Sequence, residues 1–162
     1  MRKAIYPGTF DPATVGHLDI VREAAQLFDE VTIAVGINPA KVPLFSPDER
    51  LQMLRESIEE AAWENVSAVT FDGLTVDCAR SCNARYIVRG LRAVTDFEAE
   101  FALVLGNERL EESIKTVFVM PAQRHIYLSS SIVRQAAELG RRIIPGSVPP
   151  PVEKRLREKF NF

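Results

Sequence analysis

Three stretches of the chain bring together residue types that bind phosphate. The first is a turn rich in glycine and proline, residues 7–17, which follows the apolar residues 4–6. Nucleotide-binding α/β folds begin in this way, because the helix that follows the turn presents free N–H groups and a partial positive charge to an anion. His17 stands where that helix starts, and its imidazole can donate to a phosphate oxygen while Gly16 lets the backbone come close. The alternative is that His17 only caps the helix.

The other two stretches are Arg89-Gly90-Leu91-Arg92 and Ser129-Ser130-Ser131. Two guanidinium groups flanking a glycine past a strand end can bind phosphate, although a pair of ion-pairing surface arginines is the plainer interpretation. The serines precede an apolar helical run, so they offer hydroxyl and N–H groups to phosphates and can equally be an ordinary N-cap.

Strands and helices alternate along the whole sequence. Apolar or β-branched runs predict strands at residues 4–6, 31–37, 66–71, 85–88 and 116–120. Helical spacing predicts helices at residues 18–28, 75–83 and 96–110, one from the capping box Ser46-Pro47-Asp48-Glu49, one from Ser129 to Gly140, and a last one with Val152, Leu156 and Phe160. This order indicates a five-stranded parallel sheet with helices on both faces and a C-terminal helix. Ligands of such sheets bind beyond the carboxyl ends of the strands.

Several finer expectations accompany these elements. Leu51, Leu54, Ile58 and Ala61 should form the buried stripe of the second helix. The centre of helix 96–110 is apolar on every side, so this helix is either sandwiched inside the fold or partly covered by another subunit. Residues 121–128 should form a connecting loop, and residues 145–151 a proline-rich linker along the surface.

Composition limits the class of protein. The 162 residues are 46% hydrophobic with a formal net charge of -2, which predicts one globular domain over residues 1–162 and disfavours a nucleic-acid partner. No segment resembles a leader or a membrane span, so we expect a cytoplasmic protein. Cys78 and Cys82 lack nearby histidines and are expected to be buried free thiols rather than zinc ligands.

The motifs together resemble one enzyme family. Tyr6-Pro7-Gly8-Thr9-Phe10-Asp11-Pro12, then Thr14-x-Gly16-His17, the Arg89 to Arg92 motif and the three serines occur in this order. The sequence is similar over its whole length to bacterial phosphopantetheine adenylyltransferases, which are Rossmann-like nucleotidyltransferases with a T/HxGH signature. The resemblance implies transfer of the adenylyl group from ATP to 4'-phosphopantetheine, giving dephospho-coenzyme A and pyrophosphate. It also implies Mg²⁺ brought with ATP, coenzyme A as a feedback inhibitor, and a homohexamer.

The resemblance also implies roles for individual residues. His17 would bind ATP and act as the transition-state stabiliser at the α-phosphate, the one catalytic role, since the chemistry is an in-line attack without a covalent intermediate. The ATP-binding residues would be Thr9, Phe10, His17, Gly90, Leu91, Arg92, Glu100, His125, Ile126, Tyr127, Leu128, Ser129, Ser130 and Ser131. The acceptor would contact Thr9, Lys41, Thr75 and Arg89.

Two positions depart from the family pattern. Ala99 stands where a tyrosine is common, so the pocket walls can differ here, and His125 stands where an aromatic residue is frequent. His125 is accordingly the weaker ligand candidate, with an exposed loop histidine as the alternative. Two other functions stay open: transfer of an adenylyl or cytidylyl group to another phosphorylated acceptor, and a catalytically silent nucleotide-binding regulator.

Overall fold

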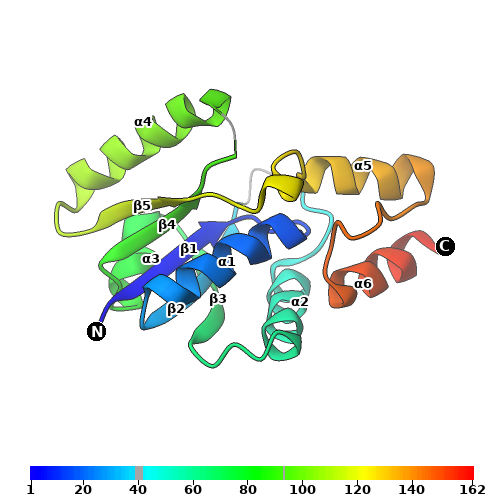
Figure 1. Ribbon diagram of the computed structural model, residues 1–162, viewed down its shortest axis with the longest axis horizontal. Helices are drawn as coiled ribbons and strands as arrows, with labels where there is room; N and C mark the ends of the chain where they lie inside the picture. Colours follow the sequence, from blue (N-terminus) through cyan, green and yellow to red (C-terminus); the bar gives the residue numbers. More distant parts are fainter. Residues whose placement is uncertain (39–41, 93) are drawn as a thin grey trace.

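The computed structural model describes residues 1–38, 42–92 and 94–162 and contains one five-stranded sheet (Figure 1). Its strands are β1 Lys3–Gly8, β2 Glu30–Ile37, β3 Val66–Asp72, β4 Tyr86–Gly90 and β5 Lys115–Val119. All paired strands are parallel, in the order β3-β2-β1-β4-β5. The predicted strands and the predicted parallel sheet are confirmed.

Helices cover the sheet on both faces. They are α1 Val15–Leu27, α2 Pro47–Glu60, α3 Thr75–Ser81, α4 Val94–Leu110, α5 Ser130–Gly140 and α6 Pro150–Phe160, with a short 3₁₀ turn at Gln123–His125. Alternate residues of β1 point to opposite faces: Ala4 and Tyr6 join the core with α1, α2 and α6, whereas Ile5 packs with Val76 and Ala79 of α3. This alternation is the two-residue period of a strand buried on both sides.

The strand order creates a crevice beside β1. From β1 the chain first builds β2 and β3 on one side, and then returns to place β4 and β5 on the other side. The connections that leave the carboxyl ends of β1 and β4 therefore diverge, which is where open parallel sheets bind their ligands. The loop after β1 and the residues after β4 lie on either side of this crevice.

Several boundaries and exposures differ from the sequence-based expectations. Helix α1 begins at Val15, because Thr14 caps it, rather than at Leu18. Ala61 is the exposed C-cap of α2, while the capping box of Ser46 and Glu49 is present as predicted. Gly140 is the last residue of α5, and Arg141 takes the left-handed conformation with φ 46°.

The proline-rich segment 145–151 is not simply a surface linker. Ser147 and Val148 are buried, and the Ser147 carbonyl accepts from the backbone N–H of Val15 at 3.0 Å. The segment therefore anchors the start of α1 before α6 begins. Cys78 is a buried free thiol as expected, whereas Cys82 is only half-buried.

Helix α4 lies over the outer part of the sheet beside β5 and is mostly open to solvent (Figure 1). Phe97, Phe101, Leu103 and Leu105 are exposed apolar residues on it. The expectation that this helix is sandwiched inside the fold is therefore wrong, and the alternative, cover by another subunit, stays a prediction. Among the described residues no helix is both long and apolar enough to span a membrane.

Leu156 offers a test of how α6 contributes to the fold. Its side chain is 0% exposed within the core shared with α2, so Leu156→Ala leaves a cavity and should lower the free energy of unfolding by about 2–5 kcal/mol. Urea denaturation followed by circular dichroism measures this. Leu139→Ala is the matched control because Leu139 is 80% exposed. Equal losses in the two variants would contradict the placement of α6 in the core.

Candidate active site

A pocket of about 300 Å³ lies in the crevice between the ends of β1 and β4. It is lined by residues from all three phosphate-binding stretches of the sequence: Gly8, Phe10, Gly16, His17, Arg89, Gly90, Arg92, Ser129, Ser130 and Ser131, together with Tyr6, Pro7, Thr14, Ile20, Pro121 and Leu128. Segments that are far apart in sequence therefore converge on one cavity, as their positions at strand ends predict.

His17 caps helix α1 and also lines the pocket. The backbone N–H of Thr14 donates to Nδ1 of His17 at 3.0 Å, and the hydroxyl of Thr14 accepts from the His17 backbone N–H at 3.3 Å. Because Nδ1 accepts this bond, the neutral ring carries its proton on Nε2. The two interpretations of His17, helix cap and phosphate donor, are therefore compatible in one geometry.

The surroundings keep the ring of His17 neutral. Burial, together with the positive charge of Arg92, lowers the pKa of His17 to about 4. At neutral pH the imidazole is thus an uncharged donor with a fixed orientation. Such a donor loses little on reorganisation when charge develops on a bound oxygen, which is the requirement for transition-state stabilisation.

Phe10 packs against His17 from the β1 turn. Its ring is edge-on to His17 with centroids 5.2 Å apart and edge-on to Tyr6 at 5.3 Å. The backbone of Phe10 has φ 49°, an uncommon value for a bulky residue. Gly8 makes room for the ring, since a Cβ at that position would lie 2.9 Å from the Phe10 side chain. The packed rings of Tyr6 and Phe10 therefore support the imidazole of His17 from one side.

Arg89 does not point freely into the pocket. Its Nε and one terminal nitrogen donate to the two carboxylate oxygens of Glu100, both at 2.6 Å, and its other terminal nitrogen donates to the carbonyl of Pro7 at 3.1 Å. The bidentate pair ties α4 to the end of β4. The predicted roles of Arg89 at the acceptor and Glu100 at ATP thus belong to two side chains that bind each other in this structure.

The remaining residues of the Arg89–Arg92 motif shape the pocket in different ways. Gly90 contacts α1 so closely that a Cβ would lie 2.2 Å from Cδ1 of Ile20. Arg92 donates to the carbonyl of Leu128 at 3.2 Å and lines the cavity, whereas Leu91 bonds through its backbone to Val119. Arg92 therefore brings a guanidinium group to the wall of the pocket.

The serines and the segment before them separate into two groups. Ser129 caps α5 by accepting from the Ile132 N–H at 3.3 Å, and the Ser130 hydroxyl donates to the Pro12 carbonyl at 2.8 Å. Leu128 and the three serines line the pocket, but His125, Ile126 and Tyr127 do not. Tyr127 is 89% exposed. Of the predicted ATP-binding residues 125–131, only residues 128–131 therefore line the pocket.

His125 is not the exposed loop histidine that the sequence left open as an alternative. Its side chain is 17% exposed, and its Nδ1 contacts the buried carboxylate of Asp19 on α1. Its ring faces a separate shallow hollow, which Arg124 and Trp63 also line.

A second pocket of about 360 Å³ adjoins the first and shares Ser130 and Ser131 with it. Thr9 lines this second pocket, together with Asn38, Val42, Arg50 and Arg134. The predicted acceptor residue Lys41 lies outside the described residues. Thr9 is thus beside the first pocket but in the second one, which suits a residue between two substrates.

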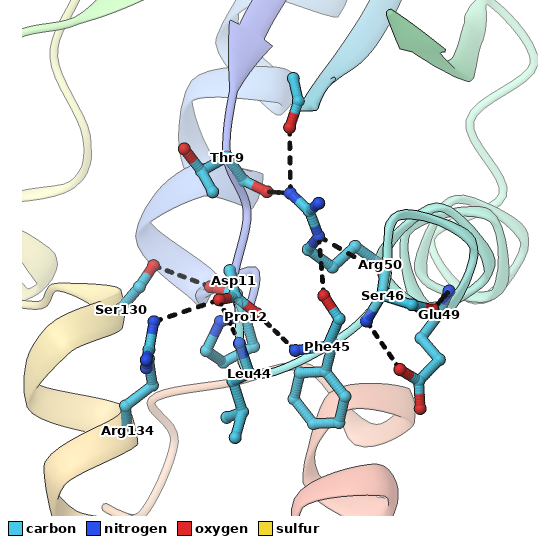
Figure 2. A network of polar contacts seen from close by, with 11 residues as sticks. Thr9, Asp11, Pro12, Leu44, Phe45, Ser46, Glu49, Arg50, Ser130 and Arg134 are labelled. Carbon is cyan, nitrogen blue, oxygen red and sulfur yellow. Dashed lines mark hydrogen bonds and ion pairs between the residues drawn. The ribbon is translucent and has the colours of Figure 1, made fainter. Parts of the chain in front are cut away.

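Two buried charges hold the segments around the second pocket (Figure 2). Asp11 accepts from the backbone N–H groups of Leu44 and Phe45 at 2.7 and 2.9 Å and from Arg134 at 3.1 Å. Arg50, only 2% exposed, donates to the carbonyls of Thr9 at 2.6 Å and Gly36 at 3.1 Å.

Sequence reasoning missed the roles of Asp11, Arg50 and Arg134. A signal for Arg50 existed, because it stands four residues before Leu54 on the face of α2 that also carries Met53 and Ser57. A lone arginine on an apolar face does not disclose its partners, since the carbonyls that it binds, those of Thr9, Gly36 and Phe45, belong to three other segments.

Thr75 and Arg89 lie together in a small hollow of about 40 Å³ under α4. Leu103, Val104 and Asn107 complete it, and sequence reasoning had not singled out these three residues. Two of the four predicted acceptor contacts are therefore neighbours, with apolar side chains of α4 beside them.

The described part of the chain contains no cluster of three or more His, Cys, Asp or Glu side chains that could hold a metal ion.

Comparisons with known proteins fit this geometry. The cytidylyltransferase-like family matches residues 5–136. A solved bifunctional NMN adenylyltransferase/ADP ribose pyrophosphatase from Francisella tularensis superposes with a TM-score of 0.76 at 16% identity, over 99% of this chain and 50% of that one, which shows the shared fold. The parallel sheet, the pocket at the ends of β1 and β4 and the family match together identify the chain as a nucleotidyltransferase.

Curated relatives narrow this class. A phosphopantetheine adenylyltransferase from Desulfosudis oleivorans is 49% identical over 100% of this chain and 95% of its own length. Another from Symbiobacterium thermophilum is 51% identical over 99% of this chain and 97% of its own length. The chain belongs to the phosphopantetheine adenylyltransferase family.

The lowered pKa of His17 has a consequence for stability. Between about pH 6.5 and 4 the unfolded chain binds a proton at His17 that the folded chain does not, so this contribution to stability is full above pH 6.5 and is lost as the pH falls towards 4. His17→Asn keeps an acceptor for the Thr14 N–H but does not titrate. Urea denaturation at several pH values should show a steeper loss in the wild type, by up to about 3 kcal/mol. Parallel pH curves for the two proteins would contradict this.

Proposed function

We propose that the chain transfers the adenylyl group of ATP to 4'-phosphopantetheine. An oxygen of the acceptor phosphate attacks the α-phosphorus, the bond to the β-phosphate oxygen breaks, and dephospho-coenzyme A and pyrophosphate leave. The observation that carries the proposal is His17, a neutral donor fixed by Thr14 in a pocket that Arg92 and the start of α5 also line. The named relatives support the identity of nucleotide and acceptor.

The pocket geometry supports a division of roles. His17 donates from Nε2 to the α-phosphate, where negative charge grows in the transition state. The β- and γ-phosphates are received by Arg92, Ser129, Ser130 and Ser131, which line the pocket. They combine a guanidinium, the N–H groups of a helix start and the hydroxyls of Ser129 and Ser131, whereas the hydroxyl of Ser130 is bound to Pro12. Gly90 and Phe10 shape the nucleotide wall.

The acceptor side uses the second pocket. Thr9, which lines this pocket, binds the acceptor phosphate, and the pantetheine arm runs towards Thr75 and Arg89. The family resemblance adds Lys41, which lies outside the described residues, as a second contact of the acceptor. Arg89 keeps one proton on each terminal nitrogen beyond its bonds to Glu100 and Pro7, so it can serve the acceptor without releasing Glu100. In this scheme Glu100 has two roles: it orients Arg89 through their paired hydrogen bonds, and it contacts the nucleotide.

Magnesium is expected to enter bound to ATP. Mg²⁺ commonly keeps several waters and binds through substrate phosphates with few protein ligands. A site without a cluster of acidic side chains among the described residues fits that mode. The ion supplies charge neutralisation of the phosphate chain, while the protein contributes His17, Arg92 and the helix start.

Two further expectations concern regulation and location. Coenzyme A contains the dephospho-coenzyme A skeleton, so it can occupy the product-binding pockets and act as a feedback inhibitor. The cytoplasm supplies ATP and keeps thiols reduced, which suits the free Cys78 and Cys82.

The reaction is tested by measuring pyrophosphate release with ATP or CTP and with several phosphorylated acceptors. Turnover should require ATP and 4'-phosphopantetheine together. Turnover with a different acceptor and none with phosphopantetheine would favour another nucleotidyltransferase. ATP binding without turnover on any acceptor would favour the silent regulator.

The role of His17 predicts a specific kinetic defect. His17→Asn retains the helix cap but lacks a donor at the ε position, so kcat should fall about 10²–10³-fold while the Kd for ATP changes only a few-fold. Single-turnover kinetics and calorimetry measure the two quantities. Arg55→Gln, on the exposed face of α2, is the control. A weaker affinity for ATP with kcat unchanged would mean that His17 contributes to ground-state binding alone.

The exposed face of α4 supports a homohexamer as the assembly. Phe97 and Phe101 stack with centroids 5.6 Å apart on this face, and Leu103 and Leu105 are exposed near them. An apolar surface of this kind on a soluble chain is expected to be covered by another copy. Such contact would also stiffen the helix that carries Glu100.

This assembly is tested by Phe101→Glu. A charge at the centre of the apolar face should shift the protein to smaller species in sedimentation velocity at micromolar concentration. Leu139→Glu is the matched control: it makes the same change of charge at a leucine that is 80% exposed on α5, and it should leave the assembly intact. A wild type that sediments as a monomer would exclude the hexamer.

A further inference from the structure

Asp19 is a buried carboxylate that the roles proposed so far do not use. It lies on α1 two residues beyond His17, and it is only 3% exposed. Its oxygens accept from Arg22 at 2.6 Å, from the backbone N–H of Ala122 at 3.3 Å and from Nδ1 of His125. These donors compensate the burial of the charge. Two of the three come from one segment, residues 121–128.

That segment frames the nucleotide pocket at both of its ends. Pro121 and Leu128 line the pocket, and the two groups bound to Asp19 lie between them. The Leu128 N–H donates to the His125 carbonyl at 3.0 Å, and the Leu128 carbonyl accepts from Arg92 at 3.2 Å. A continuous chain of contacts therefore runs from Asp19 through His125 and Leu128 to Arg92.

The same segment lies directly on the start of α1. A Cβ at Gly16 would be 3.6 Å from the His125 carbonyl oxygen and 3.7 Å from the His125 Cβ. The backbone of His125 thus contacts the helix turn that carries His17. Asp19 itself lines the shallow outer hollow and not the pocket, so any effect on a ligand must pass through this segment or through α1 itself.

We propose that Asp19 is a positioning residue for the nucleotide. By holding Ala122 and His125 on α1, it sets the separation between His17 on one side of the pocket and Arg92 and the serines of α5 on the other. The phosphate chain of ATP must contact both sides at once. If residues 121–128 are no longer held on α1, the affinity for ATP falls while the acceptor pocket stays intact. The inference rests on ATP being the nucleotide.

Two variants interrupt the contact from opposite ends. Asp19→Asn replaces an acceptor by an amide that presents a donor, and His125→Leu removes the ring nitrogen but keeps an apolar side chain. Each should raise the KM for ATP about tenfold, with the KM for 4'-phosphopantetheine unchanged within twofold and kcat at saturating ATP reduced less than threefold. Arg22→Gln is the matched control: it removes the half-exposed third partner of Asp19 and should leave all three parameters unchanged.

The double variant separates positioning from general stabilisation. If both residues act through one contact, the Asp19→Asn/His125→Leu protein should show no larger rise in the KM for ATP than the more severe single variant. Multiplied effects would overturn the proposal, and so would a folded Asp19→Asn or His125→Leu protein whose KM for ATP is unchanged. If Asp19→Asn fails to fold, the proposal is still tested by comparing the KM for ATP of His125→Leu with that of Arg22→Gln.

Binding of ATP measured by calorimetry without acceptor keeps this inference apart from the proposed function. If the wild type binds ATP but does not use phosphopantetheine, the proposed acceptor is wrong. The same variants then still test the positioning role of Asp19, because their Kd for ATP can be measured without acceptor. A wild type that does not bind ATP would refute both proposals.

Discussion

The site depends on one hydrogen bond, the donation from the Thr14 backbone N–H to Nδ1 of His17. This bond begins helix α1, assigns the tautomer of the imidazole and turns its remaining proton towards the pocket. A helix start leaves N–H groups that need partners, and here one of those partners is His17, the residue proposed to stabilise the transition state. Local folding and the orientation of the donor therefore have the same physical cause.

Buried charges connect this corner to the rest of the fold. Asp11 connects the turn after β1 to the backbone at Leu44 and Phe45 and to α5. Arg50 connects the same turn to β2. Asp19 connects α1 to the segment before α5. Backbone groups of other segments are the main partners of Asp11 and Arg50. Asp19 is compensated by the side chains of Arg22 and His125 and by one backbone N–H. Because an unpaired buried charge is costly, each contact resists separation of the segments it links. Loops that would otherwise move independently thus keep fixed distances around the pockets.

Much of the fold could be predicted from the sequence because the signals are local. The alternating β-branched runs, the capping box at Ser46 and the serine cap at Ser129 each act within a few residues. His17 and Arg92 could be assigned to the pocket because both follow strand ends. The sequence could not reveal that Arg89 binds Glu100 or that His125 binds Asp19, since those pairs depend on how α4 and the 3₁₀ turn pack. The exposure of α4 was ambiguous for a related reason: an apolar helix has the same pattern in a core and on an uncovered face.

The pocket between β1 and β4 is assembled from residues near positions 8–17, 89–92 and 128–131. No contiguous part of the chain contains it, because the strands that separate these segments must first pair in the order β2-β1-β4-β5. Nucleotide affinity is consequently a property of the complete sheet, and a partly folded chain has no residual site. A nucleotide that binds only the complete fold raises the melting temperature in proportion to the logarithm of its excess over Kd. ATP bound in this pocket would therefore stabilise the folded chain, in addition to serving as the proposed substrate.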